Sequence, residues 1–189
     1  MAHEQQKEFC ERIRNTYTYY FRNKRVLDIG SLDVNGNNRY LFSTNDYFGI
    51  DIGDGNNVDF ACIGHKYEAP DNYYDAIIST NCFEHDMFYE KTITNAIRML
   101  RSGGLFLFSS ASTGREEHGT KKTDGWAAPL LMNIPLWEDY YKNLTKEDIL
   151  SIDGFNMIFP DGIFEYNKES CDLFFYGIKN GNKMLKFNI

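Results

Sequence analysis

The sequence predicts an α/β fold: a doubly wound, mostly parallel sheet in three αβα layers, with an antiparallel hairpin at its C-terminal edge. Three observations lead to this prediction. Short apolar runs that end in Gly or Asp alternate with helical patterns, which is typical of βαβ units. Residues 105–109 are apolar almost throughout, as in a strand buried on both faces. The closing stretch, 155–178, alternates like two antiparallel strands that flank a turn.

The first half of the chain supplies four of the expected strands. Before them, residues 4–21 carry Phe9, Ile13 and Tyr17 at near-helical spacing, which predicts an amphipathic helix. Residues 38–43 are also expected to be helical. The four strands are expected at residues 25–30, 47–51, 58–63 and 74–79.

The second half supplies the other three strands and two helices. A helix is predicted over 87–100, and the glycines in 102–104 are expected to stop it. Thr145 is expected to cap a second, short helix. The three strands are expected at residues 105–109, 155–164 and 172–178, which brings the sheet to seven strands.

We expect one domain over residues 1–189, because no repeat and no low-complexity linker divides the chain. Residues 111–141 lack clear periodicity, and structureless loops of that length are usually functional. We therefore interpret this stretch as a substrate lid, and an insertion without a role is the alternative. The expected parts are an N-terminal helix (1–22), a cofactor-binding core (24–111), the substrate lid (112–143), and a C-terminal helix and hairpin (144–189).

Composition narrows the classes of function. The net charge of −7 argues against the broad attraction to phosphate that nucleic-acid binding needs. The four cysteines include no CxxC pair, so neither a disulfide framework nor a zinc site is predicted. No apolar run approaches the about 20 residues that cross a bilayer, and the polar N-terminus is unlike a secretory signal. We therefore expect a cytoplasmic protein with reduced cysteines and no membrane partner.

The carboxyl ends of the first two strands carry residues that suit a nucleoside ligand, and ligands of open α/β sheets bind at this rim. Gly30 lets the backbone approach a ligand closely. Asp28 can hold the ammonium of an amino-acid ligand, directly or through water. Asp51 ends the second strand, where an acid can accept hydrogen bonds from both ribose hydroxyls. The pair of acids favours a ligand site over the alternative, two carboxylates that cap loops.

The glycine spacing separates two kinds of nucleoside cofactor. A nicotinamide dinucleotide needs G-x-G-x-x-G around its pyrophosphate. Only Gly30 and Gly36 are present here, and Asp33 between them would place negative charge beside the phosphates. S-adenosylmethionine has no phosphate and carries a positive sulfonium, so it tolerates an acidic pocket. The sequence therefore favours S-adenosylmethionine, with S-adenosylhomocysteine as the product.

An ordered series of short motifs resembles the class I, Rossmann-like methyltransferases. The motifs are Val26-Leu-Asp-Ile-Gly-Ser31, Tyr47-Phe-Gly-Ile-Asp51, Tyr74-Asp-Ala-Ile-Ile-Ser79, Phe83-Glu-His85 and Leu100-Arg-Ser-Gly-Gly-Leu105. More narrowly, the series is similar to the type 11 group, in which "EH" follows the fourth strand and "LxPGG" precedes the fifth. The resemblance covers residues 24–111 and implies methyl transfer from S-adenosylmethionine.

The resemblance also implies which residues contact the cofactor. Residues at the end of the first strand would line its methionine portion, and those after the second strand its ribose. Residues after the third strand would flank the adenine, and those after the fourth would lie under the methionine portion and the sulfonium. The residues at these places are Asp28, Gly30, Ser31, Asp51, Ile52, Cys62, Ile63, Asn81 and Cys82.

This chain departs from the family pattern in three ways. Leu32 stands where the second glycine of G-x-G is usual, so we expect the loop to turn through Asn35 and Gly36 instead. Ile63 stands where an acid often meets the adenine amino group, which leaves that contact to the backbone. The link 52–57 between strands two and three has little room for the usual helix.

Two histidines are the candidate catalytic residues. Methyl transfer is an in-line displacement, so the protein must chiefly align donor and acceptor. A hydroxyl acceptor also needs a general base, for which histidine is suited near neutral pH. His85 follows the fourth strand, and His118 lies in the expected lid. The alternative for His85 is that Glu84 and His85 cap the next helix and shape the pocket floor. No compact ligand set is visible, so no metal is predicted.

Four aromatic residues in and next to the lid offer a wall for a planar or sugar-like acceptor, with simple packing as the alternative. They are Trp126, Trp137, Tyr140 and Tyr141. The sequence thus predicts a methyltransferase that acts on oxygen or nitrogen of a small-molecule or sugar (glycan) acceptor. A methyltransferase-like binding module without catalysis is the second interpretation, and a nucleic-acid methyltransferase, disfavoured by charge, the third. The chain fits a monomer and a homodimer equally.

Overall fold

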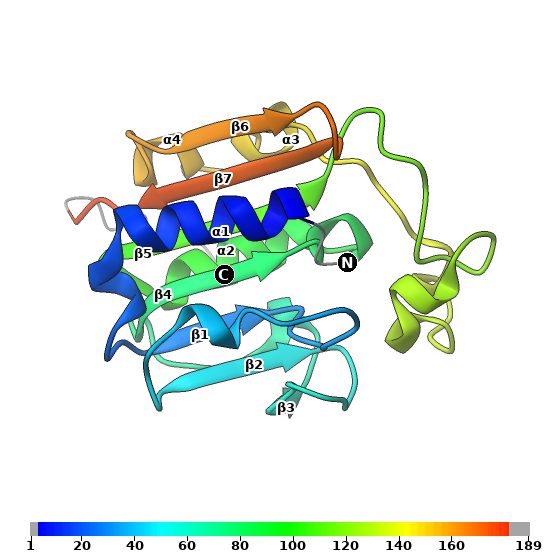
Figure 1. The fold of residues 1–189 in the computed structure, drawn as a ribbon, viewed down its shortest axis with the longest axis horizontal. Coiled ribbons are helices and arrows are strands. Elements are labelled where there is room, and N and C mark those ends of the chain that lie inside the picture. Colours follow the sequence, from blue (N-terminus) through cyan, green and yellow to red (C-terminus); the bar gives the residue numbers. More distant parts are fainter. Residues whose placement is uncertain (1–3, 182–189) are drawn as a thin grey trace.

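A seven-stranded sheet with the strand order β3-β2-β1-β4-β5-β7-β6 lies at the centre of the structure, a computed structural model that describes residues 4–181 (Figure 1). Strands β1 to β5 pair in parallel, and β7 runs antiparallel to both β5 and β6. The predicted fold class is confirmed, including the antiparallel hairpin at the C-terminal edge. The strands are β1 (Val26–Ile29), β2 (Tyr47–Asp51), β3 (Phe60–Ala61), β4 (Tyr74–Thr80), β5 (Leu100–Ala111), β6 (Ile163–Asn167) and β7 (Asp172–Ile178).

Helices cover both faces of the sheet and complete the three layers (Figure 1). Helix α1 (Glu4–Thr16) packs on one face, where Phe9 and Ile13 join a buried cluster with Val26 and Leu107. The other face carries the larger core cluster, to which three helices contribute apolar side chains. These helices are α2 (Tyr89–Met99), α3 (Lys146–Leu150) and α4 (Phe155–Ile158).

The strand order reverses between β1 and β4, because the chain returns past β1 after building β2 and β3. Both neighbouring strands are apolar and almost entirely buried, which holds their carboxyl ends in register. A switch of this kind leaves a crevice outside the carboxyl ends of the strands. The fold therefore places a ligand site at the ends of β1, β2 and β4.

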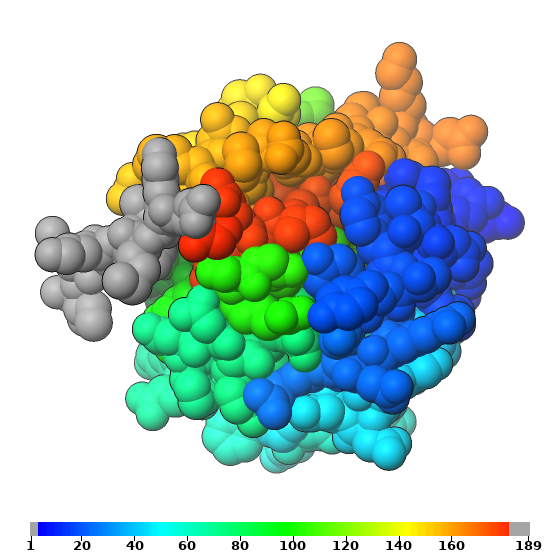
Figure 2. Space-filling view, turned by 90° about the vertical axis from the view of Figure 1, so that its left-hand side faces the viewer, coloured from blue at the N-terminus to red at the C-terminus, as the bar shows by residue number. Residues whose placement is uncertain are grey.

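The opposite end of the sheet is closed by the N-terminal segment. Figure 2 views this end and shows the blue N-terminal residues beside the green start of β5 and the red end of β7. The Tyr20 hydroxyl donates a 2.8 Å hydrogen bond to the Gly103 carbonyl, and the Gly103 amide donates one of 2.8 Å to the Lys179 carbonyl. This end is therefore structural, and the ligand rim lies at the other end.

Two expected elements of the first half are shorter than predicted. Residues 38–43 form only a single 3-10 turn, Arg39–Leu41, and not a longer helix. The third strand keeps two residues, Phe60–Ala61, at the sheet edge, in place of residues 58–63. This edge strand pairs with β2 only, so fewer hydrogen bonds extend it than extend a central strand.

Two expectations for the second half were wrong for identifiable reasons. The glycines in 102–104 do not stop the helix: α2 already ends at Met99, and the glycines lie inside β5, where the β4–β5 register shifts. Residues 155–158 are helix α4 and not strand. Phe155, Ile158 and Phe159 recur at helical spacing, and all three are buried in the core. The predicted cap at Thr145 is confirmed as a capping box.

Residues 1–3 of the expected N-terminal segment (1–22) and residues 182–189 of the expected C-terminal segment (144–189) lie outside the described residues. Within residues 4–181, none of the helices is long and apolar enough to pass through a lipid bilayer.

Candidate active site

A cavity lies where the fold predicts it, outside the carboxyl ends of β1, β2 and β4. All the residues that the family resemblance assigns to the cofactor line this cavity, and so does His85, whereas His118 is not part of its wall. The strand ends thus bring together residues that lie far apart in the chain, from Asp28 to His85. The cavity wall includes Asp28, Gly30, Ser31, Asp51, Ile52, Cys62, Ile63, Asn81, Cys82 and His85.

Gly30 is the position at which the loops after β1 and β4 come into contact. Its φ is +77°, a left-handed conformation that favours glycine, and a Cβ atom there would lie 2.4 Å from Cβ and Sγ of Cys82. Its amide donates a 2.9 Å hydrogen bond to the Ile50 carbonyl. A side chain at position 30 would therefore both strain the backbone and push the two loops apart. The loop makes its next positive-φ turn at Gly36, as expected for a chain with Leu32 in place of glycine.

Asp28 is fully buried in β1 and is held by two neighbours. Its carboxylate accepts a hydrogen bond of 3.2 Å from the Asn38 amide and a very short one from the Tyr47 hydroxyl. Burial raises the pKa of Asp28 to about 7, although both hydrogen bonds act in the opposite direction. A cation that approaches this carboxylate would favour its ionised form. Asp28 is therefore suited to a positively charged ligand group.

Asp51 ends β2 and fastens the loop that follows β1. Its Oδ2 accepts a 3.0 Å hydrogen bond from the Leu32 amide, and its Oδ1 accepts one of 2.7 Å from the Ile52 amide. Burial raises the pKa of Asp51, and these backbone hydrogen bonds lower it. Each carboxylate oxygen has a second lone pair. Asp51 therefore combines a fixed orientation with free capacity to accept hydrogen bonds from a ligand diol.

Asn81 follows β4 in a left-handed conformation, with a φ of +47°. Its side-chain oxygen accepts a 2.7 Å hydrogen bond from the Ser109 hydroxyl, which fixes the orientation of the amide. The Nδ2 atom is then buried with no hydrogen-bond partner among the described residues. An unpaired buried donor is costly, by about 1–3 kcal/mol. A ligand acceptor in the cavity would satisfy this donor.

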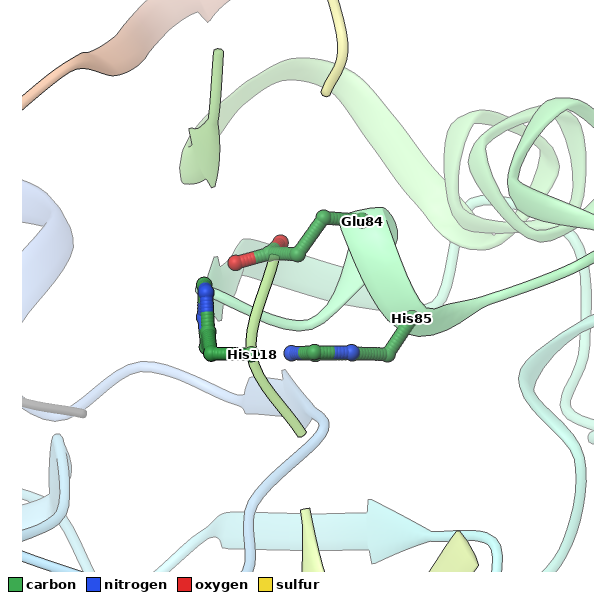
Figure 3. Close-up of side chains that lie close together, drawn as sticks. All are labelled: Glu84, His85 and His118. Atoms are coloured by element: carbon green, nitrogen blue, oxygen red, sulfur yellow. The ribbon is translucent and has the colours of Figure 1, made fainter. Parts of the chain in front are cut away.

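The two candidate catalytic histidines lie side by side although His118 is outside the cavity wall. Their ring centroids are 5.1 Å apart, and the Tyr141 ring lies 5.5 Å from His85 and 5.0 Å from His118. Figure 3 shows both rings together with the Glu84 carboxylate. Burial and the His118 charge lower the pKa of His85 to about 3, and burial lowers the pKa of His118. Both imidazoles are therefore neutral at pH 7, the form in which histidine binds a metal ion.

Residues 112–143 form an irregular lobe at the rim of the sheet, seen in yellow-green at the right of Figure 1. Three 3-10 turns occur in it, and it contains neither a strand nor an α-helix. Leu130 lies over the loop after β2, with its Cδ2 atom 3.3 Å from where a Cβ of Gly53 would be. The Trp137 ring packs against Phe88 at a centroid distance of 5.9 Å. The lobe also contributes apolar residues, among them Leu130 and Trp137, to the cavity wall.

The expected aromatic wall is only partly present. Trp137 lines the cavity, and Tyr141 lies against the two histidines. Trp126 is 54% exposed and is not part of the wall. The backbone of the lobe passes close to His85, because a Cβ on Gly119 would lie 2.6 Å from His85 Cε1.

Several wall residues were not found from the sequence. Gln6 reaches the cavity from α1, and Asn38 bridges Asp28 and Thr80. Nothing in the local pattern around Gln6 marks it, because a single polar residue on an amphipathic helix is ordinary. The lid contacts were equally invisible, because they come from a segment without periodicity. They are Ala127, Ala128, Pro129, Leu130 and Leu131.

Comparison with protein families decides the class of the chain. A family model described as a methyltransferase domain matches residues 1–142, about three quarters of the sequence. The chain belongs to this methyltransferase family. The family that the sequence motifs predicted, the methyltransferases of class I fold, is confirmed. A comparison with curated proteins finds no match.

Solved methyltransferase structures share the fold of this methyltransferase at low sequence identity. Phosphoethanolamine N-methyltransferase 2 of Haemonchus contortus, solved with phosphomonomethylethanolamine and S-adenosylhomocysteine, has a TM-score of 0.62 and 15% identity over 92% of this chain and 52% of its own. The present chain thus spans about half of that enzyme.

Two further structures match over almost their whole length. A methyltransferase of Archaeoglobus fulgidus, described as S-adenosylmethionine-dependent, has a TM-score of 0.58 and 14% identity, over 92% of this chain and 94% of its own. The 1,6-didemethyltoxoflavin-N1-methyltransferase of Burkholderia thailandensis, solved with 1,6-didemethyltoxoflavin and S-adenosylhomocysteine, has a TM-score of 0.58 and 12% identity, over 95% and 92%. At these identities the likeness establishes the fold of this methyltransferase.

Proposed function

We propose that this methyltransferase binds S-adenosylmethionine in the cavity at the ends of β1, β2 and β4 and transfers its methyl group to oxygen or nitrogen of a small-molecule or sugar acceptor. One observation carries the donor assignment: Asp51 ends β2 with its carboxylate oriented by the Leu32 and Ile52 amides, 3.0 and 2.7 Å away. This places a fixed carboxylate with unused lone pairs where a ribose diol is bound in α/β folds of this kind.

The other cavity residues fit the same donor. Asp28 and Asp51 give the cavity negative charge, which suits an ammonium and a sulfonium and opposes a pyrophosphate. Gly30 keeps the cavity floor free of a side chain, and the unpaired Asn81 Nδ2 can donate to a ligand oxygen. When bound, S-adenosylmethionine supplies a methyl group on a positively charged sulfur that is a good leaving group. The chain itself has to hold donor and acceptor in line.

The acceptor side is formed by the lobe and the histidines. We assign residues 112–143 as a substrate lid over a cofactor-binding core (24–111), flanked by the N-terminal segment (1–22) and the C-terminal helices and hairpin (144–189). Support comes from the lid residues Leu130 and Trp137, which give the cavity an apolar wall. An apolar wall excludes water and suits a compact organic acceptor. Two of the similar structures were solved with small molecules of that kind bound.

A hydroxyl acceptor needs a group that takes its proton. His85 and His118 are both neutral at pH 7, because burial lowers the pKa of each. His118 is the better candidate base, since its pKa is less strongly lowered by burial and its side chain is only half-buried. His85 then shapes the boundary between donor and acceptor, because it lines the cavity and lies against His118.

Calorimetric titration of the chain with S-adenosylmethionine and S-adenosylhomocysteine tests this proposal. We expect saturable binding of both ligands at a ratio of one per chain. An absence of heat for both ligands at high micromolar concentration would rule out the enzyme and leave a partner module with a methyltransferase fold. The acceptor is then sought by incorporation of labelled methyl groups into pools of small molecules and nucleotide sugars. Labelling of nucleic acid alone would contradict the acceptor class.

A further inference from the structure

A compact set of ligand-type side chains lies beside the donor cavity. Ligand atoms of Glu84, His85 and His118 all lie within 4.8 Å of one another. Figure 3 shows the Glu84 carboxylate and the tip of the His85 ring turned toward the His118 ring. We infer that these three side chains form a binding site for one divalent transition-metal ion, with Zn²⁺ as the best fit. The inference does not depend on the proposed function, because none of the three side chains is among the residues assigned to the methyl donor.

Two buried polar atoms in the cluster have no partner. Glu84 is 0% exposed and His85 is 8% exposed. The Oε1 atom of Glu84 and the Nδ1 atom of His85 have no hydrogen-bond partner among the described residues. Each such atom costs about 1–3 kcal/mol when it is left unpaired. The unpaired Oε1 atom of Glu84 is explained if the site normally holds an ion.

The remaining polar atoms of the cluster are held as in metal sites. The Nδ1 atom of His118 lies 3.0 Å from the Glu116 carbonyl oxygen, so Nδ1–H can donate a hydrogen bond to this oxygen. The lone pair of Nε2 is then available to bind the ion. The Ser110 hydroxyl donates a 3.1 Å hydrogen bond to Oε2 of Glu84, which leaves Oε1 for the ion. Backbone carbonyls and hydrogen-bonded carboxylates of this kind orient histidine and carboxylate ligands around zinc.

The relative position of the rings agrees with a shared ion. The His85 and His118 ring centroids are 5.1 Å apart, with an angle of 88° between the ring planes. Two imidazoles bound to one zinc ion at about 2.0–2.1 Å, in tetrahedral geometry, have centroids about 5 Å apart. Small rotations of the side chains then suffice to bring the ligand atoms to the ion.

The donor set selects the kind of ion. Two imidazoles and one carboxylate suit zinc and other first-row transition metals, whereas Mg²⁺ and Ca²⁺ prefer oxygen ligands throughout. Three protein ligands also leave a position open, as in catalytic zinc sites. Because His85 lines the donor cavity, the open position is beside that cavity.

If the proposed function holds, the ion gives the acceptor side a defined chemistry. A hydroxyl acceptor in the open position would lose its proton to water more readily, since a bound cation lowers the pKa of the oxygen. The oxygen lone pair then attacks the methyl carbon, and the electron pair of the carbon–sulfur bond leaves with sulfur. With the ion bound, His85 and His118 act as ligands, and the acceptor needs no separate base.

Titration of the chelator-treated chain with Zn²⁺, followed by calorimetry, tests the site, and the visible absorption of bound Co²⁺ reports the coordination geometry. We expect one ion per chain. The variants H118Q, H85Q and E84Q should each lower the affinity by at least about tenfold, since even the groups that orient zinc ligands contribute 10–100-fold. H65Q is the matched control, because His65 lies outside the cluster, and it should bind Zn²⁺ like the parent.

The site is disproved if the parent chain binds no stoichiometric Zn²⁺ or Co²⁺, or if H118Q binds both ions as tightly as the parent. His118 is only half-buried, so H118Q should fold, and a thermal unfolding curve checks this. A parallel titration with S-adenosylmethionine keeps the two proposals apart. Donor binding without metal binding overturns the ion site alone, and metal binding without donor binding overturns the proposed function alone.

Discussion

The two sides of the cavity are built in different ways. The donor side consists of the ends of buried parallel strands, where Asp28, Gly30 and Asp51 have positions set by the strand register. The side that we propose for the acceptor consists of a lobe without α-helix or strand, in which His118 lies against His85. Rigid strand ends suit a ligand that is always the same, and a loop lobe suits a substrate that differs between relatives. The two sides should therefore respond differently to substitution.

The largest expected effect separates catalysis from donor binding. His118→Ala should lower turnover by about 10²–10⁴-fold, the usual contribution of a group that removes the acceptor proton, whether His118 takes that proton itself or holds the proposed ion. It should leave the dissociation constant of S-adenosylmethionine within about twofold, because His118 does not line the donor cavity. The measurements are labelled-methyl transfer and calorimetry on the same preparation. Trp126→Ala, an exposed change in the same lobe, is the control and should change neither. Equal losses of turnover and donor affinity would show that His118 has no separate role on the acceptor side.

Gly30→Ala compared with Gly103→Ala sharpens the account of the donor side. Both glycines have a positive φ, but a Cβ at Gly103 would meet nothing within 4 Å, whereas one at Gly30 would meet Cys82 at 2.4 Å. Gly103→Ala should cost about 1–2 kcal/mol from backbone strain alone. Gly30→Ala should cost a further about 1–3 kcal/mol from overpacking and should also weaken donor binding. Urea denaturation measures both costs. Equal costs would mean that the loops after β1 and β4 are not in contact.

Asp51→Ala compared with Asp54→Ala tests the donor carboxylate. The loss of a charged acceptor should cost about 1.5–3 kcal/mol of binding free energy, or about 10–150-fold in affinity for S-adenosylmethionine. The variant also leaves the Leu32 and Ile52 amides without their acceptor. Asp54 is exposed in the same loop, so Asp54→Ala should bind like the parent. Calorimetry decides, and parental affinity in Asp51→Ala would mean that the ribose lies elsewhere.

The last expected effect concerns stability and its dependence on pH. Burial raises the pKa of Asp28 from 3.8 to about 7, so between pH 4 and 7 the folded chain holds a proton that the unfolded chain has released. The Asp28 contribution to stability is thus fully present below about pH 4 and is lost as the pH rises through 7. Asn does not titrate, so Asp28→Asn removes the fall in stability between pH 4 and 7 that Asp28 causes. This variant should gain up to about 4 kcal/mol over the parent at pH 8, which corresponds to a shift of about three pKa units, and nothing at pH 4.

Thermal and urea unfolding from pH 4 to 8 measure the Asp28 effect. Asp46→Asn is the control, because the Asp46 carboxylate is exposed in an ion pair with Arg25. A constant difference between Asp28→Asn and the parent at every pH would show that Asp28 titrates as an ordinary surface acid. The same variant should bind S-adenosylmethionine more weakly, since the cavity loses a negative charge.

The sequence predicted which strand-end residues line the cavity, because the signals for them are local. Strand β1 ends in Asp-Ile and is followed by Gly30, β2 ends in Gly-Ile-Asp, and both runs are mostly apolar. The prediction was wrong where one local pattern of apolar residues is compatible with both a strand and a helix. Phe155, Ile158 and Phe159 fit both an alternating strand and a helical face. All three are buried in one core cluster, where Phe155 and Phe159 contact Phe175, and this burial favours the helix. The glycines in 102–104 were assigned to a helix end, although they belong to the irregular start of β5.

The sequence by itself determined the fold class, the methyltransferase family and the residues at the donor rim, because apolar periodicity and strand-end motifs are encoded over a few neighbouring residues. Only the tertiary structure decided that the lobe lines the cavity with Leu130 and Trp137 and that His118 lies against Glu84 and His85. These contacts join segments far apart in the chain, and nothing in the pattern of either segment specifies the other. Their positions follow from how the aperiodic lobe packs onto the finished sheet.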